Sequence, residues 1–322
     1  MQKYPLGRSG IDVAPLALGG NVFGWTADEQ RSFEVLDAFA DAGFNLIDTA
    51  DVYSGWIPGH VGGESERMIG RWLARRGRRD DVVIATKVGM EMKSGGKGLS
   101  RDYILRATEQ SLERLQTDYI DLYQAHIDDK STPLEETLGT FAELIQAGKV
   151  RAIGASNYET DRLAAALAKS RELGLPRFET FQPWYNLYDR VAFEGPPEVL
   201  CRREGLGVIP YFGLASGFLT GKYRSEKDLA GSARAYRVKE MLNERGLRIL
   251  AALDAVAADY NATPAQIALA WLRAHGVTAP IASATSVKQL EELIGFVRIE
   301  LDSEAVAKLD AASEGGSQPP GW

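Results

Sequence analysis

Eight short apolar runs recur along this chain, and stretches with helical periodicity separate them. A strand that is followed by a helix and then by another strand of the same sheet pairs in parallel, through a right-handed crossover. Eight such units with no Pro/Gly-rich linker between two halves predict a closed (β/α)8 TIM barrel in a single domain, rather than an open doubly wound sheet. That domain is expected to span residues 1–322. The runs are PLAL (15–18), FNLI (44–47), VVIAT (82–86), YIDLYQ (119–124), VRAIGA (150–155), FETFQ (178–182), GVIPY (207–211) and APIAS (279–283).

Local patterns also predict how the barrel is closed and covered. The stretch YPLGRSGIDV (4–13) predicts a β-hairpin that turns at Ser9 and Gly10 and plugs the bottom of the barrel. Two of the intervening segments, RSFEVLDAFADAG and LEETLGTFAELIQAGK, are amphipathic helical patterns. They end at Gly43 and Gly148, which suit left-handed C-caps.

The C-terminal third departs from the simple alternation of strands and helices. An insertion between residues 212 and 262 combines a Gly-rich loop with a helix from about Lys239 to Asp259. Extra C-terminal helices are expected, the last of them over 303–312. The composition of EGGSQPPGW predicts a flexible tail over 312–322.

Charge and composition exclude several classes of protein. A net charge of -7 disfavours nucleic acid and anionic membrane partners, and no window approaches the roughly 18 apolar residues of a membrane helix. The basic run over 75–79 follows a helical pattern and is typical of a solvated helix end. The single cysteine, Cys201, and an N-terminus without a secretory apolar stretch predict a cytoplasmic location. Nothing in the sequence indicates an oligomeric state.

Polar side chains stand where the second, third and fourth predicted strands end. Asp48 and Tyr53 lie in DTADVYS, directly after FNLI, while Lys87 follows VVIAT and His126 follows YIDLYQ. Each of them alone is compatible with packing or capping. In a (β/α)8 barrel, however, the loops after the strands form one mouth, so these four side chains are expected to lie together.

An acid, a phenol, an amine and an imidazole in one site suggest protonation of a carbonyl oxygen. A nearby Lys87 ammonium would lower the pKa of Tyr53 and make the phenol a better proton donor, and Asp48 would keep that ammonium charged. His126 would orient the carbonyl by a hydrogen bond. This chemistry requires a separate source of hydride.

The usual motifs for a cofactor or for other chemistry are missing. No GxGxxG follows a strand, and SGFLTGKY has Ser216 and Tyr223 where a P-loop requires Gly and Ser or Thr. His60, His126 and His275 lack metal-ligand spacing, and no GxSxG elbow occurs. We therefore expect no metal site.

Loop residues at the later strand ends suit a dinucleotide that lies across the barrel mouth. Ser156, Asn157 and Gln182 provide the hydroxyl and amide groups to hold a carboxamide. Tyr211 provides a flat face for a ring, and the Gly-rich backbone from Gly213 onward, with Lys222, could approach a pyrophosphate.

Taken in order, these motifs resemble the aldo-keto reductases, in particular their bacterial and potassium-channel-β-like branch, from about Tyr4 to Leu309. The matching stretches are DTADVYSGWIPGHVGGESERMIG, IATK, LYQAH, GASNY, FQPWYN and GLASGFLTGKY. The resemblance implies a barrel that binds NADP(H) without a Rossmann domain. It also implies a catalytic tetrad of Asp48, Tyr53, Lys87 and His126, with Tyr53 as the general acid and a small carbonyl or alcohol as the substrate.

The same resemblance implies a set of cofactor-binding positions. Gly20 and Asn21 would border the nicotinamide, and Arg234 is a candidate for a 2'-phosphate. The full set is Gly20, Asn21, Asp48, Ser156, Asn157, Gln182, Tyr211, Phe212, Gly213, Leu214, Ala215, Ser216, Lys222, Arg234, Ser283, Thr285, Gln289 and Glu292.

The adenosine end departs from the family pattern. ASATSVKQLEEL lacks the arginine that often precedes Gln-Leu-x-Glu-Asn and has Leu293 in place of the asparagine. Lys288 and Arg234 are the basic residues that could substitute for it. NADP(H) remains the expected cofactor, and NAD(H) is compatible with this loop.

Aromatic loop residues predict an apolar substrate pocket, suited to aromatic or medium-chain aldehydes and ketones. The pocket is expected to contain Trp25, Tyr53, Trp56, Met90, His126 and Trp184, with Ile57 and Phe218 nearby. A cation such as Lys93 could anchor a charged substrate.

Two alternatives to an NAD(P)H-dependent carbonyl reductase stay open. One is an NAD(P)-dependent alcohol dehydrogenase that works mainly in oxidation, with Tyr53 as the base. The other is a non-catalytic subunit that senses the cofactor. The resemblance weighs against the second, because the channel-β proteins carry asparagine at the position of His126.

Overall fold

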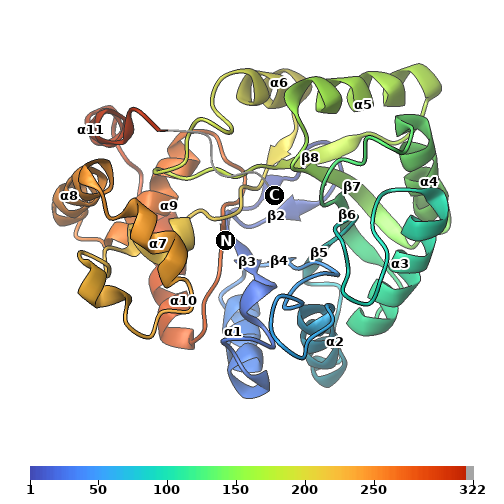
Figure 1. The fold of residues 1–322 in the computed structure, drawn as a ribbon, viewed down its shortest axis with the longest axis horizontal. Helices are drawn as coiled ribbons and strands as arrows, with labels where there is room; N and C mark the ends of the chain where they lie inside the picture. The colour runs from blue at the N-terminus through green and yellow to red at the C-terminus, as the bar shows by residue number, and fades with distance from the viewer. Residues whose placement is uncertain (317–322) are drawn as a thin grey trace.

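The computed structural model describes residues 1–316, and its centre is a curled parallel sheet (Figure 1). Within these residues the sheet has eight strands. In spatial order they are β10 (Ile281–Ala282), β3 (Ala17–Gly19), β4 (Leu46–Asp48), β5 (Val83–Val88), β6 (Ile120–Ala125), β7 (Val150–Ser156), β8 (Phe178–Gln182) and β9 (Gly207–Val208).

Backbone hydrogen bonds join the two outer strands of this sheet. The amide of Thr278 donates to the carbonyl of Val208 at 2.9 Å, and the amide of Ile281 donates to that of Pro210 at 2.9 Å. The sheet therefore closes on itself, which confirms the predicted (β/α)8 barrel. The carboxyl ends of all its strands open on one face, where an active site of this fold is expected.

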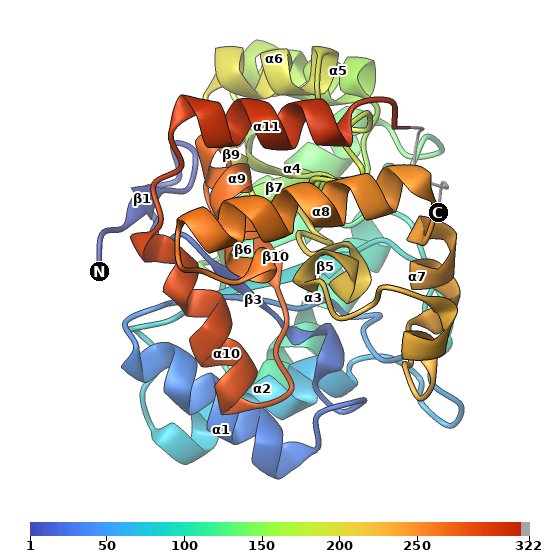
Figure 2. The same ribbon diagram turned by 90° about the vertical axis from the view of Figure 1, so that its left-hand side faces the viewer.

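Helices cover the outside of the barrel, as Figures 1 and 2 show from two directions. They bury apolar stripes against the strands: in α1, Phe33, Leu36 and Phe39 are buried. Gly43 and Gly148 follow α1 and α4 with positive φ, as predicted. The helices are α1 (Glu29–Asp41), α2 (Glu64–Arg76), α3 (Arg101–Leu115), α4 (Leu134–Gln146), α5 (Thr160–Leu173), α6 (Pro196–Glu204), α7 (Ala235–Met241), α8 (Glu244–Asp259), α9 (Pro264–Ala274), α10 (Val287–Ile294) and α11 (Ser303–Ser313).

The N-terminal hairpin plugs the barrel as predicted. Its strands, β1 (Tyr4–Pro5) and β2 (Asp12–Val13), pair antiparallel, and Leu6 and Ile11 are buried in the apolar cluster of the barrel interior. Gly7 allows the close fit, because a Cβ there would lie 2.1 Å from the carbonyl oxygen of Glu179.

The predicted helix from Lys239 to Asp259 is wrong in one respect: it is two helices. The chain breaks between α7 and α8, where the side chain of Asn243 accepts a hydrogen bond from the amide of Gly246 and caps α8. At a helix start, an asparagine side chain accepts a hydrogen bond from a free backbone N–H. Inside a continuous helix, the same side chain would compete with the backbone hydrogen bonds, so asparagine favours a new helix start. Gly246 is also required there, because a Cβ would lie 1.8 Å from the carbonyl of Met241.

The C-terminal segment is ordered further than the composition indicated. Ala312 and Ser313 belong to α11 and are buried, which differs from the flexible tail expected from residue 312. The Ser313 hydroxyl accepts a hydrogen bond from Arg190 at 2.8 Å, and this contact holds the helix end. The rest of the predicted tail includes residues 317–322, which lie outside the described residues.

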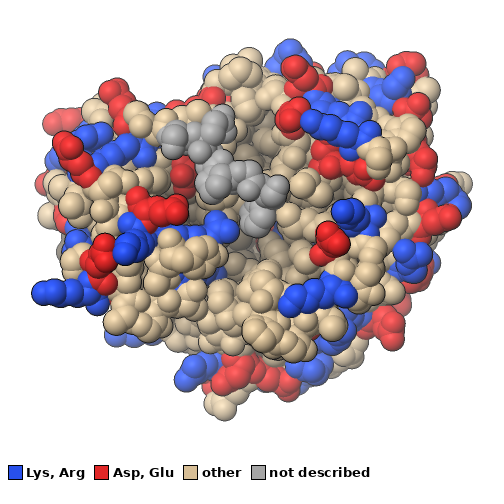
Figure 3. Space-filling view, in the orientation of Figure 1, with Lys and Arg blue, Asp and Glu red and all other residues tan. Residues whose placement is uncertain are grey.

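Charges of both signs are interspersed over the face seen in Figure 3. The arginines of the basic run are paired: Arg75 with Asp37, and Arg79 with the buried Asp121 at 2.6 Å. Within the described part of the chain, no helix is long and apolar enough to cross a membrane.

Candidate active site

Three of the four predicted catalytic residues form one hydrogen-bonded cluster, in which Lys87 and Asp48 are buried and Tyr53 is half-buried. The Lys87 ammonium lies 2.8 Å from Oδ2 of Asp48 and donates to the Tyr53 oxygen at 3.0 Å. The Tyr53 hydroxyl in turn donates to the same Asp48 oxygen at 3.3 Å. The ammonium also donates to the carbonyl of Thr49 at 2.6 Å. All three donors of the ammonium are thereby satisfied, which a buried lysine requires.

The parallel register of β4 and β5 explains how the Asp48 side chain of DTADVYS meets Lys87, and a turn then brings Tyr53 to the same place. Asp48 ends β4 and pairs with Ala85 of β5, so Lys87, two residues further along β5, lies on the same face of the sheet one step closer to the mouth. The chain then turns back through residues 49–54, where the amide of Tyr53 donates to the carbonyl of Ala50. This turn returns the phenol above the ion pair.

Burial and charge determine the protonation of Tyr53. Burial raises the pKa of Tyr53 well above its usual value, and the nearby Asp48 charge raises it further. Burial also lowers the pKa of Lys87, against the opposing effect of Asp48. The expectation that Lys87 lowers the pKa of the phenol is wrong, because burial raises this pKa and Asp48, which reaches the same hydroxyl, raises it further. Tyr53 is therefore a neutral proton donor at neutral pH.

His126 lies beside this cluster, directly after β6. Its ring centroid is 6.0 Å from that of Tyr53, and its side chain is buried. Burial, followed by the charge of Lys87, lowers the pKa of His126 well below its usual value. The imidazole is therefore neutral, and Nδ1 has no hydrogen-bond partner among the described residues. A neutral imidazole can donate one N–H to an oxygen at the mouth.

These residues open onto a cavity of about 870 Å³ at the carboxyl ends of the strands. The predicted residues that line it are Asn21, Trp25, Asp48, Tyr53, Trp56, His126, Ser156, Asn157, Gln182, Tyr211, Phe212, Gly213, Leu214, Ser216, Lys222, Arg234, Ser283, Thr285, Gln289 and Glu292. The sequence reasoning missed further lining residues, among them Val22, Thr26, Gly217, Thr220, Tyr223, Tyr236, Arg237 and Leu293.

Five predicted residues are not part of that wall. Lys87 lies beneath Asp48 and Tyr53, to which it is bonded. Gly20 lies against the backbone of Asp48, where a Cβ would be 2.9 Å from its carbonyl oxygen. The remaining three, which the lining does not include, are Met90, Trp184 and Ala215.

The amide groups in the cavity are held in fixed orientations. Gln182 donates to Oδ1 of Asp48 at 2.9 Å, and Asn157 donates to the carbonyl of His126 at 2.9 Å. The Tyr211 hydroxyl donates to Oδ1 of Asn157 at 2.7 Å, while the Ser156 hydroxyl donates to the carbonyl of Gln182 at 2.9 Å. Amide side chains that are already held in place suit a carboxamide ligand, because they lose little conformational entropy when the ligand binds.

The loop after β9 has the backbone of an anion site. Phe212, Ala215 and Ser216 adopt left-handed φ values of 58°, 47° and 58°, which cost L residues about 1 to 3 kcal/mol each. Such turns gather N–H groups into a concave surface that binds anions. Lys222 packs against Gly217, where a Cβ would lie 3.6 Å from its Nζ. This cradle fits the pyrophosphate of a dinucleotide.

Comparison with known proteins agrees with this geometry. A model of the aldo/keto reductase family matches residues 15–314. The chain belongs to the aldo/keto reductase family. The resemblance that the motifs indicated is therefore confirmed, and membership of a reductase family places the chain among the oxidoreductases.

Several curated proteins are similar to this chain along nearly their whole length. The uncharacterized oxidoreductase YrpG of Bacillus subtilis (strain 168) is 37% identical over 99% of this chain and 98% of its own. Aldo-keto reductase yakc of Schizosaccharomyces pombe, whose name specifies NADP(+), is 32% identical over 99% and 96%. A protein of Oryza sativa subsp. japonica, named "Probable voltage-gated potassium channel subunit beta", is 33% identical over 97% and 96%.

Aromatic rings form one wall of this aldo/keto reductase cavity. Trp56 lies edge-on to Tyr53 at 6.0 Å between centroids, and Trp25 lies edge-on to Trp56 at 5.7 Å. Trp184, a predicted substrate residue, instead packs against Tyr211 at 5.8 Å and donates from its indole to Asp189 at 2.9 Å. Trp184 thus contacts Tyr211 and is not among the residues that line the cavity.

The far end of the cavity is polar. Ser283 donates to the side chain of Asn21 at 2.7 Å, and the Thr285 hydroxyl donates to Gln289 at 3.0 Å. Arg234, the candidate for a 2'-phosphate, lines the same cavity, and its guanidinium lies 5.7 Å from the ring centroid of Trp25. No group of three or more His, Cys, Asp or Glu residues suited to a metal ion occurs in the described chain.

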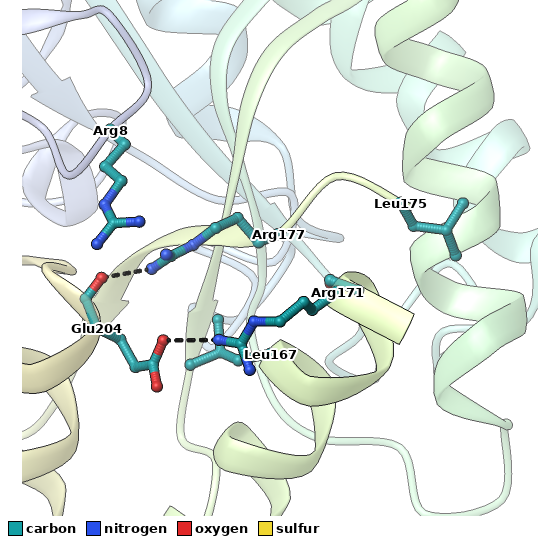
Figure 4. Close-up of a pocket in the computed structure, with 7 residues that line it drawn as sticks. Arg8, Leu167, Arg171, Leu175, Arg177 and Glu204 are labelled. Carbon is teal, nitrogen blue, oxygen red and sulfur yellow. Dashed lines mark hydrogen bonds and ion pairs between the residues drawn. The ribbon is translucent and has the colours of Figure 1, made fainter. Parts of the chain in front are cut away.

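A second, smaller cavity of about 210 Å³ lies where the chain enters β8 and β9 (Figure 4). There Arg171 donates to the Glu204 carboxylate at 3.2 Å, and Arg177 donates to the Glu204 carbonyl at 2.9 Å. This cavity lies on the amino side of the strands, away from Tyr53, where residues of a (β/α)8 barrel serve stability.

Proposed function

We propose that this protein is an NADPH-dependent reductase that converts aldehydes and ketones to alcohols, with Tyr53 as the general acid. The observation that carries this proposal is the placement of a neutral, half-buried phenol on the cavity wall, bonded to Lys87 and Asp48. Membership of the aldo/keto reductase family and the NADP(+) in the name of the yeast relative support the choice of cofactor.

In the proposed reaction, the bound nicotinamide supplies a hydride to the carbonyl carbon. Tyr53 gives its hydroxyl proton to the carbonyl oxygen, so that the substrate gains one hydride and one proton and leaves as an alcohol. Lys87 and Asp48 hold the phenol in place and stabilise the charge that develops on its oxygen. His126 donates a hydrogen bond to the same carbonyl oxygen and thereby orients it.

We assign the remaining cavity residues to the cofactor by their chemistry. Ser156, Asn157 and Gln182 would hold the carboxamide, and Tyr211 would stack on the ring. The loop after β9, with Lys222, would hold the pyrophosphate, and the polar groups around Ser283 would meet the adenosine end.

The protonation of Tyr53 supports our choice of reduction over oxidation at neutral pH. Oxidation of an alcohol needs Tyr53 as a phenolate, and burial together with Asp48 raises the pKa of Tyr53 and opposes that form. Reduction needs the neutral phenol, which is the form present at neutral pH.

The test of this proposal is oxidation of NADPH and of NADH, followed at 340 nm, with a panel of aromatic and aliphatic aldehydes and ketones. We expect carbonyl-dependent oxidation that is faster with NADPH. Tight cofactor binding without turnover of any carbonyl or alcohol would contradict the proposal and indicate a cofactor-sensing protein.

The pH dependence of reduction follows from the two shifted groups. Tyr53 donates only when protonated, and its pKa is raised above the usual value of about 10, so activity is retained up to alkaline pH and is lost as pH rises through the raised pKa. Because the pKa of His126 is lowered, the imidazole does not titrate near its usual pKa of about 6.5. We expect kcat/KM for reduction to be flat from about pH 6.5 to pH 9 in buffers of constant ionic strength. An ionisation in the middle of that range would contradict the assignment.

A further inference from the structure

Behind the reacting end of the cavity, one serine joins the two loops that follow the neighbouring strands β3 and β4. Ser65 is the second residue of α2, a helix on the outside of the barrel (Figure 1), and its side chain is fully buried. Its hydroxyl donates to the carbonyl of Gly20 at 2.8 Å and accepts from the hydroxyl of Thr49 at 2.8 Å. Ser65 does not line the cavity, so it has no direct part in the proposed reaction.

The bond to Gly20 fixes the direction of the Ser65 hydroxyl. A carbonyl oxygen can only accept, so the single hydrogen of the hydroxyl goes to Gly20 and its lone pairs remain for Thr49. The close approach is possible because Gly20 has no side chain: a Cβ there would lie 2.8 Å from the Ser65 Oγ. Ser65 is therefore held as an acceptor for the Thr49 hydroxyl.

Thr49 extends this arrangement to the Lys87 ammonium. Its carbonyl accepts from the Lys87 Nζ at 2.6 Å, next to the bonds that the ammonium makes to Asp48 and Tyr53. Its amide donates to the carbonyl of Ala85 in β5 at 2.8 Å. Because the hydroxyl is held from α2 and the amide from β5, the carbonyl is held toward the ammonium.

The charge of Lys87 depends on such contacts, because the side chain is fully buried. Burial lowers the pKa of Lys87, against the opposing effect of nearby carboxylates. A carbonyl that accepts a hydrogen bond from the charged form favours that form. The Ser65 hydroxyl is uncharged, so its removal changes hydrogen bonds and none of the charges around the ammonium. The titratable groups around Lys87 are Asp48, Asp51, Tyr53, Glu66 and His126.

We propose that Ser65 is a positioning residue, which acts through Thr49 to orient the Lys87 ammonium beneath Tyr53. This inference rests on the proposed function, because it concerns how the general acid of that reaction is supported. Without the Ser65 hydroxyl, the buried Thr49 hydroxyl loses its acceptor, and the turn after β4 shifts to find another. The ammonium then loses the fixed carbonyl of Thr49, so Lys87 gives up its proton at a lower pH.

The first experiment compares Ser65→Ala with Ser32→Ala by the pH dependence of kcat for one aldehyde at saturating NADPH. Ser32 is the matched control: it is also fully buried, lies near the start of α1, donates to the carbonyl of Ala27 and does not line the cavity. We expect Ser65→Ala to lower kcat about 10-fold at neutral pH, because the ammonium is misplaced. We also expect its alkaline loss of activity to move to lower pH by about one unit, while Ser32→Ala keeps the wild-type profile. If the two variants share one profile, Ser65 has only a structural role and the proposal fails.

A second variant tests the connection through Thr49. Thr49→Val removes the hydroxyl and keeps the carbonyl and the shape of the side chain. We expect it to shift the alkaline limb as Ser65→Ala does, and we expect the double variant Ser65→Ala/Thr49→Val to shift it no further than either single variant. Shifts that add in the double variant would show that Ser65 does not act through Thr49, and would overturn the proposal.

The titration of Lys87 itself separates this proposal from the proposed function. The NMR signal of the Lys87 Cε carbon, assigned by its absence from Lys87→Met, reports protonation of the amine without any turnover. A lower midpoint in Ser65→Ala than in the wild type and Ser32→Ala supports the positioning role even if no carbonyl is reduced, in which case only the proposed function fails. An unchanged midpoint in Ser65→Ala overturns the positioning role even if kcat falls.

Discussion

Replacement of Tyr53 by phenylalanine is expected to lower kcat for carbonyl reduction by about 10²- to 10⁴-fold, the range that a general acid contributes. The variant removes only the hydroxyl, so the proton must come from water. The fold should be kept, because Lys87 retains its bonds to Asp48 and to the carbonyl of Thr49. Steady-state kcat and a fluorescence titration with NADPH measure the two effects separately, and cofactor affinity should change little.

A matched control for this variant is Tyr123→Phe. Tyr123 is fully buried, whereas Tyr53 is half-buried; the Tyr123 hydroxyl has no hydrogen-bond partner among the described residues, and Tyr123 lies outside the cavity. Its replacement should leave turnover near the wild-type rate. Comparable turnover in Tyr53→Phe and Tyr123→Phe would remove the general-acid assignment.

Lys87→Met is expected to abolish most turnover and to lower the free energy of unfolding by about 3 to 5 kcal/mol. The side chains of Lys87 and Asp48 are 0% and 2% exposed, so methionine leaves the Asp48 carboxylate buried without its cation. Gln182 would still donate to Asp48, but one amide hydrogen bond does not neutralise a buried charge. Urea denaturation followed by circular dichroism measures the loss, and kcat reports the chemistry.

Two further variants test the cause of that loss. Asp48→Asn combined with Lys87→Met removes the unpaired charge and should recover part of the stability without recovering turnover. Lys93→Met removes an exposed lysine and should change the unfolding free energy by no more than about 0.5 kcal/mol. If the double variant is no more stable than Lys87→Met, the destabilisation does not arise from an unpaired Asp48.

The residues at the strand ends were predictable because parallel pairing in a closed barrel leaves few positions for them. FNLI, VVIAT and YIDLYQ each predict a buried strand, and the next polar residue on each one must point toward the mouth of a closed barrel. That reasoning brought Asp48, Tyr53, Lys87 and His126 together from separate parts of the chain, and the described structure places them there.

The loops were predictable only in part. Trp184 is predicted to lie in the substrate pocket, but it packs against Tyr211 and is not among the residues that line the cavity, because the direction of a loop side chain depends on what packs beneath it. Nothing in the sequence indicates that Arg237 lines the cavity, since an arginine in a charged helical pattern is typical of a solvated surface. It lines the cavity from α7, a helix that begins before the one expected over 239–259.

The sequence by itself determined the class of fold, the order of the strands and which residues stand at their ends, because these follow from local periodicity and from the chirality of the crossovers. Only the tertiary structure decided the protonation of Tyr53 and the cations that face the cavity. A pKa depends on burial and on distances of a few ångströms, here 3.3 Å to Asp48 and 3.0 Å to Lys87, and these distances come from segments far apart in the chain. No local pattern specifies them.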